Sequence, residues 1–130
     1  MTRIHFYQVT GRLESALSLI PRLADKALRR HLDVLVHSDD THRAALADRQ
    51  LAGSGLPLSA VSVSCDGEPG QHYGLLINLA DTVPDWFSRF ERLVEIVYDD
   101  STIVLTRRQN YRFYRDRGYP LHYHDLSQSN

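Results

Sequence analysis

The sequence is short of cysteine and lysine and contains no long hydrophobic run. Cys65 is the only cysteine among 130 residues, which excludes an internal disulfide and favours the reducing cytoplasm. No apolar run approaches the ~18 residues of a membrane span, and the strand-like "MTRIHFYQV" at the N-terminus has no signal-peptide pattern. Lys26 is the only lysine, so the basic residues are almost all arginines, which bind carboxylates in a forked geometry. We therefore expect a cytoplasmic globular protein that makes no contact with a membrane.

Motifs for nucleotide cofactors are also missing. Lys26 has none of the neighbouring glycines with which a P-loop wraps phosphate. The first turn from strand to helix, "QVTGRLES", contains the single Gly11, whereas a dinucleotide pyrophosphate needs three closely spaced glycines. The glycines in "GSG" at 53–55 follow an expected helix rather than a strand. We expect no cofactor.

Seven histidines raise the question of a metal site. His122 and His124 are two residues apart, so on a strand their side chains share one face. His37 and His42 flank an expected junction between a loop and a helix. Short paired spacings of the kind that mark zinc sites do not occur, so the sequence favours scattered histidines without a metal.

Signals for catalysis are equally weak. Cys65 lies in a polar turn without the basic neighbours that lower a thiol pKa, and no G-x-S-x-G elbow is found. Two aspartate pairs, Asp39–Asp40 and Asp99–Asp100, each precede an expected helix, where carboxylates cap free amides. Helix capping therefore explains the pairs better than acid–base chemistry, and we expect no catalytic site.

Alternating strand and helix patterns predict an α/β fold. The expected strands are 4–9, 32–38, 60–64, 73–80 and 92–100, with a final edge strand at 119–126, and the expected helices are 11–30, 38–53, 84–90 and 101–118. Pro21 falls inside the first helix and either kinks it or begins its second half. Such an order predicts one domain (residues 1–126) with a mostly parallel sheet and helices on both faces, followed by a polar tail (127–130).

The stretch "RRQNYRFYRDRGY" (107–119) differs from the rest of the chain. It holds five arginines and four aromatics, although the whole chain has a net charge of −1. On a helix with 100° of rotation per residue, one set of side chains lies within about 40° of Arg108 around the helix axis. The set is Val104, Tyr111, Arg112 and Arg115. The opposite side carries Ile103, Thr106, Asn110, Phe113 and Tyr114. We expect the second set to pack on the sheet, the first to form an exposed cationic face, and Gly118 to end the helix.

Three interpretations compete for the cationic face. It could be an ordinary solvated helix surface, as most charged stripes are. It could bind nucleic acid, with arginines on phosphates and Tyr111 stacking on a base, although the net negative charge argues against this. It could also be a peptide pocket, in which arginines hold an acidic motif or a terminal carboxylate beside an aromatic ring. The third interpretation suits a nearly neutral chain best.

Several segments together form a recognisable pattern. They are Phe6-Tyr7, "LADKAL", "LDVLVHSDD", "LLINLADTVPDWFSRFERLVEIVYDD" and "RRQNYRFYRDRGYPL", the last of which contains Y-x-x-Y-R-x-x-G and a following aromatic as Tyr111, Tyr114, Arg115, Gly118 and Tyr119. In these segments, over residues 1–48 and 74–122, the chain resembles a divergent, shortened member of the DNA polymerase III chi subunit family.

The resemblance implies a Rossmann-like domain that acts as a non-catalytic accessory to the clamp loader. It implies an adaptor that binds the acidic, phenylalanine-ended C-terminal tail of single-stranded DNA-binding protein and pairs with the psi subunit. The basic residue and the aromatic of the family's tail pocket correspond to Arg108 and Tyr111. A family lysine one turn earlier corresponds to Val104, and Arg107, Arg112 and Arg115 are the candidates to replace its charge.

One segment departs from the family pattern. The family has a tryptophan after the second helix and then a phenylalanine-proline-histidine stretch, whereas "DRQLAGSGLPLSAVSVS" passes directly from helix to strand. The family contacts psi partly through that segment, so psi binding is left open here. We expect a tail-binding site made by Arg108, Tyr111, Arg115, Val104 and Arg112, with DNA contacted only indirectly. The alternative is direct binding of single-stranded nucleic acid through the same helix.

Overall fold

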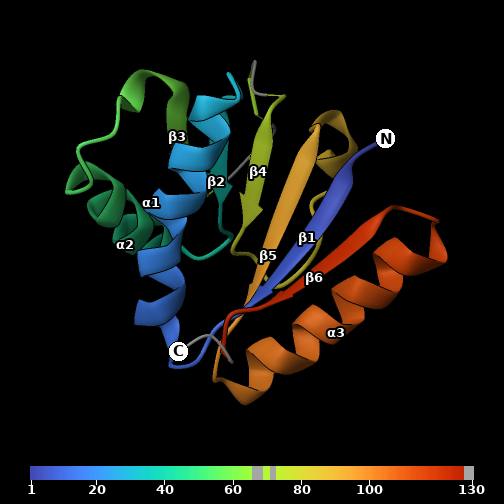
Figure 1. Cartoon of the computed structure of the whole chain (residues 1–130). Coiled ribbons are helices and arrows are strands. Elements are labelled where there is room, and N and C mark those ends of the chain that lie inside the picture. The colour runs from blue at the N-terminus through green and yellow to red at the C-terminus, as the bar shows by residue number, and fades with distance from the viewer. Residues whose placement is uncertain (66–68, 71–72, 128–130) are drawn as a thin grey trace.

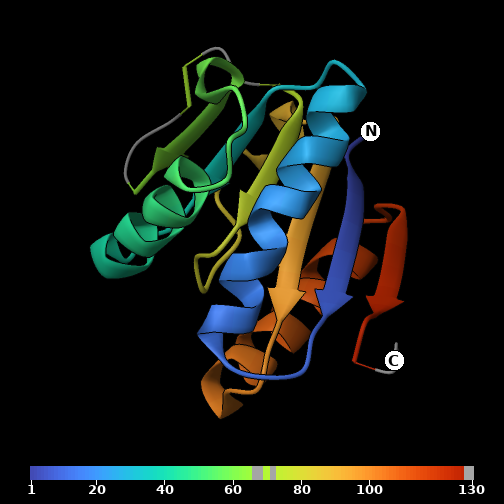
Figure 2. The same ribbon diagram turned by 60° about the vertical axis from the view of Figure 1, so that its left-hand side comes forward.

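The computed structural model describes residues 1–65, 69–70 and 73–127, which form a parallel β-sheet with helices on both faces (Figures 1 and 2). The strands are β1 (Arg3–Gln8), β2 (Val34–His37), β3 (Val61–Ser64), β4 (Leu75–Asn78), β5 (Arg92–Val97) and β6 (Leu121–Asp125). The helices are α1 (Leu13–Arg29), α2 (Thr41–Ala52) and α3 (Ser101–Asp116), with the 3-10 turns η1 (Leu58–Ala60) and η2 (Phe87–Arg89). The strand order is β3-β2-β4-β5-β1-β6, and every pairing is parallel.

The predicted fold class is confirmed. The α/β architecture is Rossmann-like, the sheet is parallel, and the last strand lies at its edge as expected. The expected helix at 84–90 is reduced to the 3-10 turn η2, and Pro21 lies within α1, which is assigned as one helical segment. Of the expected tail, residues 128–130 lie outside the described residues. No helix of the described chain has the length and apolar character needed to cross a membrane.

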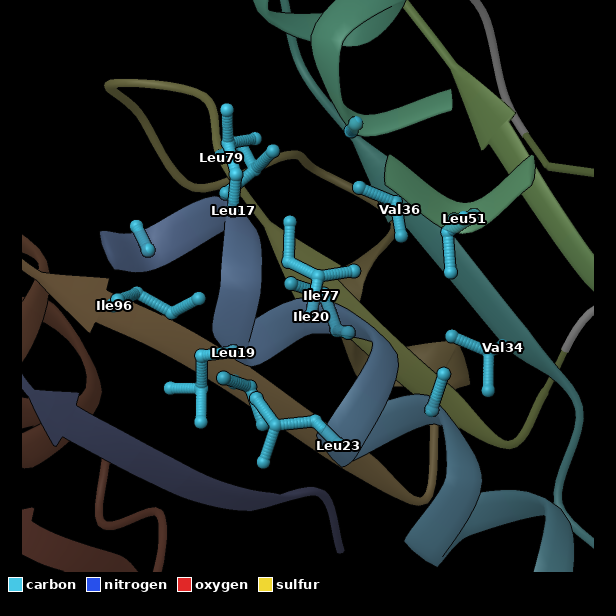
Figure 3. Packing of buried hydrophobic residues seen from close by; sticks show 14 of the residues in the cluster. Leu17, Leu19, Ile20, Leu23, Val34, Val36, Leu51, Ile77, Leu79 and Ile96 are labelled. Carbon is cyan, nitrogen blue, oxygen red and sulfur yellow. The ribbon is translucent and has the colours of Figure 1, made fainter. Parts of the chain in front are cut away.

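Alternation along the strands divides the core into two layers. One layer lies between the sheet and the helices α1 and α2, and Figure 3 shows its side chains meeting: Leu17, Leu19, Ile20 and Leu23 of α1 and Val34, Val36, Ile77 and Ile96 of the strands. The other layer lies under α3 and is rich in aromatic rings: Phe6, Phe87, Phe90 and Tyr114. Because successive strand residues face opposite sides, β1 contributes Phe6 to the α3 layer and Tyr7 to the α1 layer.

Aspartates begin two of the helices, as the sequence predicts. Asp40 accepts hydrogen bonds from the amides of His42 (2.8 Å) and Arg43 (3.0 Å) at the start of α2. Asp100 accepts them from Thr102 (2.9 Å) and Ile103 (3.1 Å) at the start of α3. These carboxylates satisfy amides that have no partner within the helix, which accounts for their position.

Gly74, just before β4, has no room for a side chain. A Cβ atom there would lie 2.6 Å from Oδ1 and 2.8 Å from the backbone nitrogen of Asp33, and closer still to its carbonyl oxygen. The Gly74 amide donates to Asp33 Oδ1, and the next amide, of Leu75, donates to the Asp33 carbonyl at 2.8 Å. The backbones of these two segments therefore meet directly.

We expect Gly74→Ala to lower the free energy of unfolding by about 1–3 kcal/mol, because the backbone must move and lose these hydrogen bonds. Gly53→Ala is the matched control, since a Cβ at Gly53 would lie 3.8 Å from its nearest neighbour. Urea denaturation measures both variants. Equal stability of the two would show that the Asp33 contact does not constrain the fold.

Candidate functional site

A cavity of about 380 Å³ lies between α3 and the strands β1, β5 and β6. Figure 1 shows α3 running alongside this end of the sheet. The helix contributes Val104, Arg107, Arg108, Tyr111, Arg112 and Arg115 to the lining, and the strands contribute Phe6, Gln8, Val97 and Tyr123. All five residues expected at the binding site therefore line one cavity.

Aromatic rings form much of the cavity wall. The Tyr111 ring meets the buried Phe6 ring edge-on, with centroids 5.2 Å apart. The Tyr123 ring is 52% exposed and stacks over Phe6 at 6.3 Å, while its hydroxyl donates to Gln8 Oε1 at 2.6 Å. Burial raises the pKa of Tyr123 and Asp125 raises it further, whereas the Arg108 charge lowers it. Arg108 and Tyr123 both line the cavity, one from the helix and the other from the edge strand.

The five arginines of the 107–119 stretch do not form one uniform patch. Arg107 is buried, Arg115 bonds its neighbour Asp116 at 3.1 Å, and the Arg117 guanidinium lies 3.7 Å from the centre of the Phe113 ring. Arg108 and Arg112 are exposed and have no ion-pair partner among the described residues. Two unpaired guanidinium groups thus lie at the cavity, fewer than the sequence alone suggested.

The packing side of α3 is predicted correctly except for Arg107. Its buried residues are Ile103, Arg107, Asn110 and Tyr114, and Thr106 and Phe113 are half-buried. Arg107, one of the candidates to replace the charge of the family lysine, belongs to this buried side, because its side chain is only 2% exposed. Its Nη1 lies 3.3 Å from Glu95 Oε1, and Glu95 is fully buried in β5. A buried guanidinium is tolerated only with such a partner, and β5 supplies it.

Glu95 is the centre of a buried polar network that attaches α3 to the sheet. Its carboxylate accepts hydrogen bonds from Asn110 (2.9 Å), Asn78 (3.2 Å) and the Tyr114 hydroxyl (2.5 Å). Burial, followed by the Glu95 charge, raises the pKa of Tyr114 well above its ordinary value, so the hydroxyl stays a donor. The network fixes the rotation of α3 and therefore the direction in which Arg108 and Tyr111 point.

Arg107 also connects this network to the cavity. It donates to the carbonyls of Ala80 (2.6 Å) and Ile96 (3.2 Å) through Nη1 and Nε. Its Nη2 is buried without a hydrogen-bond partner, and the side chain belongs to the cavity lining. The cavity therefore combines exposed cations at its rim, aromatic walls and a guanidinium in its floor, an arrangement suited to an anionic group attached to an apolar one.

The strand side of the cavity was missed from the sequence. Phe6, Gln8 and Val97 belong to strands whose neighbours are set by the topology, and no local pattern places them under α3. Tyr123 did carry a signal, because it alternates with His122 and His124 on an expected edge strand. That alternation places Tyr123 on the α3 side once the sheet order is known.

His122 and His124 share a face, as predicted, and they stack with His5 of β1. The His5 ring lies 4.7 Å from His122 and 5.3 Å from His124, and the rings are nearly parallel. No group of three or more metal-ligating side chains suited to an ion occurs in the described part of the chain.

Comparisons with known proteins agree with one another. The model of a family described as "DNA polymerase III chi subunit, HolC" matches residues 49–122. The "DNA polymerase III subunit chi" of Pseudomonas aeruginosa is 35% identical over 139 residues, covering 97% of this chain and 98% of the relative. The matched length exceeds the 130 residues of this chain, so the relative has residues at positions where this chain has none. The family match also includes residues 49–73, which the sequence pattern had not covered.

Proposed function

Because the chain belongs to the DNA polymerase III chi subunit family, a family of replication accessory subunits, we propose that it is a non-catalytic adaptor. It binds the acidic, phenylalanine-ended C-terminal tail of single-stranded DNA-binding protein and links that protein to the clamp loader in the cytoplasm. The observation that carries this proposal is the cavity beside α3, where Arg108, Tyr111 and the other expected residues meet.

Recognition in this cavity has two parts. The exposed guanidinium groups of Arg108 and Arg112 attract the acidic residues of the tail and speed its encounter with the protein. The terminal phenylalanine ring then enters between Tyr111 and Val104, where aromatic and aliphatic surface replaces water. The terminal carboxylate lies toward Arg108, whose fork holds two oxygens at once. DNA is reached only indirectly, through the tail-bearing partner.

We expect Arg108→Ala to weaken binding of a tail peptide by about 1–3 kcal/mol, because a charge-assisted hydrogen bond is lost. Isothermal titration calorimetry with the full-length chain measures the change. Arg117→Ala is the matched control, since Arg117 lies at the end of the same helix over Phe113 and outside the cavity lining. Equal affinities of the two variants would disprove the role of Arg108.

Direct binding of single-stranded nucleic acid by α3 is the second candidate. The unpaired Arg108 and Arg112 beside Tyr111 are the observation in its favour. Fluorescence anisotropy with a labelled oligonucleotide and with a labelled tail peptide, each over a salt series, separates the two functions. A steep salt dependence for the oligonucleotide that Arg108→Ala reduces, with no response to the peptide, would favour the second candidate.

A further inference from the structure

The opposite face of β1 and β6 carries a second cavity. It has a volume of about 210 Å³ and lies between the strands and the C-terminal half of α1. Its lining includes His5 and Tyr7 of β1, Arg92 of β5, His124 of β6, and Lys26 and Arg30 of α1 or its C-cap. In Figure 2, α1 crosses the central strands and leaves β1 and β6 beyond it.

Positive charge in the second cavity is uncompensated. Lys26, Arg30 and Arg92 line it, and no carboxylate of the described residues does. None of the three forms an ion pair within the described chain. Arg3 lies beside Arg92 in the sheet register, so it adds a further positive charge at the same side. Such an excess is unusual in a chain whose net charge is −1, and it indicates an anionic ligand.

The positive surroundings also act on the pKa of the nearby histidines. The pKa of His5 is lowered to about 4, first by burial and then by the charges of His122, His124, Arg92 and Arg3. Burial also lowers the pKa of His124, with His122 and Lys26 adding to the shift. Every charge that acts on these two rings is therefore positive. His5 Nε2 and Arg92 Nε are in addition buried without hydrogen-bond partners.

Flat rings continue from the second cavity along the strands. Tyr7 stacks on His124 at 4.4 Å, His124 on His5 at 5.3 Å, and His5 on His122 at 4.7 Å. The His5 and His124 rings also share a hydrogen bond of 3.0 Å between Nδ1 and Nε2. His122 is the last ring of this column, and the residue is exposed. A ring column beside a row of cations resembles the stacking platforms of proteins that bind single strands.

We propose that this second cavity binds single-stranded nucleic acid, with phosphates at Lys26, Arg30 and Arg92 and a base against the end of the ring column at His122. Lys26 and Arg30 are four residues apart and so follow one another along the same side of the helix end. An acidic peptide would use the cations but leave the exposed ring unused. The site lies across the sheet from the cavity at α3, so a peptide tail and a nucleic-acid strand can be held together.

The test uses anisotropy of a fluorescein-labelled oligothymidylate with the full-length chain at low salt. Lys26→Ala/Arg30→Ala should weaken binding about ten-fold or more and reduce the salt slope by about 1.4, because two phosphate contacts are lost. Arg22→Ala/Arg29→Ala removes the same charge from other positions of α1 and should change affinity by less than about two-fold. Arg108→Ala, which alters only the α3 cavity, should likewise leave this affinity within about two-fold.

A second readout follows the histidines by NMR. The oligothymidylate should raise the pKa of His5 and of His124, because phosphate charge stabilises their protonated forms. Inorganic phosphate at the same phosphate concentration should raise these two pKa values much less. The proposal would be overturned if the two α1 double variants weakened oligothymidylate binding equally, or if Arg108→Ala abolished it. It would also be overturned if inorganic phosphate shifted the histidine pKa values as much as the oligothymidylate does. These outcomes do not depend on the tail peptide, so they are independent of the proposed function.

Discussion

Replacing Arg107 with methionine should lower the free energy of unfolding by about 3–5 kcal/mol, because the variant leaves the Glu95 carboxylate buried without its counter-charge. Both side chains are almost completely inaccessible, at 2% for Arg107 and 0% for Glu95. The substitution also removes hydrogen bonds to the carbonyls of Ala80 and Ile96, which stay buried. Urea denaturation followed by circular dichroism measures the loss.

Arg108→Met provides the control, since it removes the same charge one residue further along an exposed side of α3. Its effect on stability should stay within about 0.5 kcal/mol, as is usual for surface substitutions. A double variant that also replaces Glu95 with leucine should recover only part of the loss. The carboxylate has three other donors, in Asn78, Asn110 and Tyr114, and all three lose this acceptor in the double variant. Asn78 and Asn110 keep hydrogen bonds to the carbonyls of Thr82 and Asp81, so the buried Tyr114 hydroxyl is affected most. Similar stabilities of Arg107→Met and Arg108→Met would contradict the buried ion pair.

Phe6→Ala should have an effect of similar size, a loss of about 3–5 kcal/mol, because it empties a closed position in the aromatic layer. The Phe6 ring is 1% exposed and packs edge-on against Tyr111 at 5.2 Å and Tyr114 at 6.0 Å. The same ring forms part of the cavity floor beside α3. Thermal unfolding monitored by calorimetry measures the loss, and tail-peptide affinity should fall as Tyr111 loses its support.

Tyr123→Ala is the control for Phe6→Ala, because it shows how much stability is lost when a side chain that lines the cavity but is not buried is removed. Tyr123 also lines the cavity, and its ring stacks on Phe6, but half of the side chain is exposed. It should therefore lower stability by no more than about 1 kcal/mol. If Phe6→Ala and Tyr123→Ala unfolded at the same temperature, burial in the aromatic layer under α3 would not contribute to stability.

Local patterns determined much of this structure. Apolar periodicity located the strands and helices, because a strand repeats every two residues and a helix every 3.6. Asp40 and Asp100 were assigned as caps because a carboxylate satisfies free amides at any helix start. The shared side of Arg108 and Tyr111 also followed from helix geometry alone, and both line the cavity that the structure contains.

Contacts between distant segments decided the rest. By helical spacing, Arg107 belongs to the same buried side as Ile103 and Asn110, but its charge argued for solvent, and only Glu95 on β5 makes its burial possible. Likewise, Phe6 and His5 are neighbours in sequence that end in two different cavities, on opposite faces of the sheet. The sequence by itself determined which residues could share a helix side or a strand face. The order of the strands decided which of those faces meet, because pairing partners come from segments up to 117 residues apart, as Ile4 and Leu121 are.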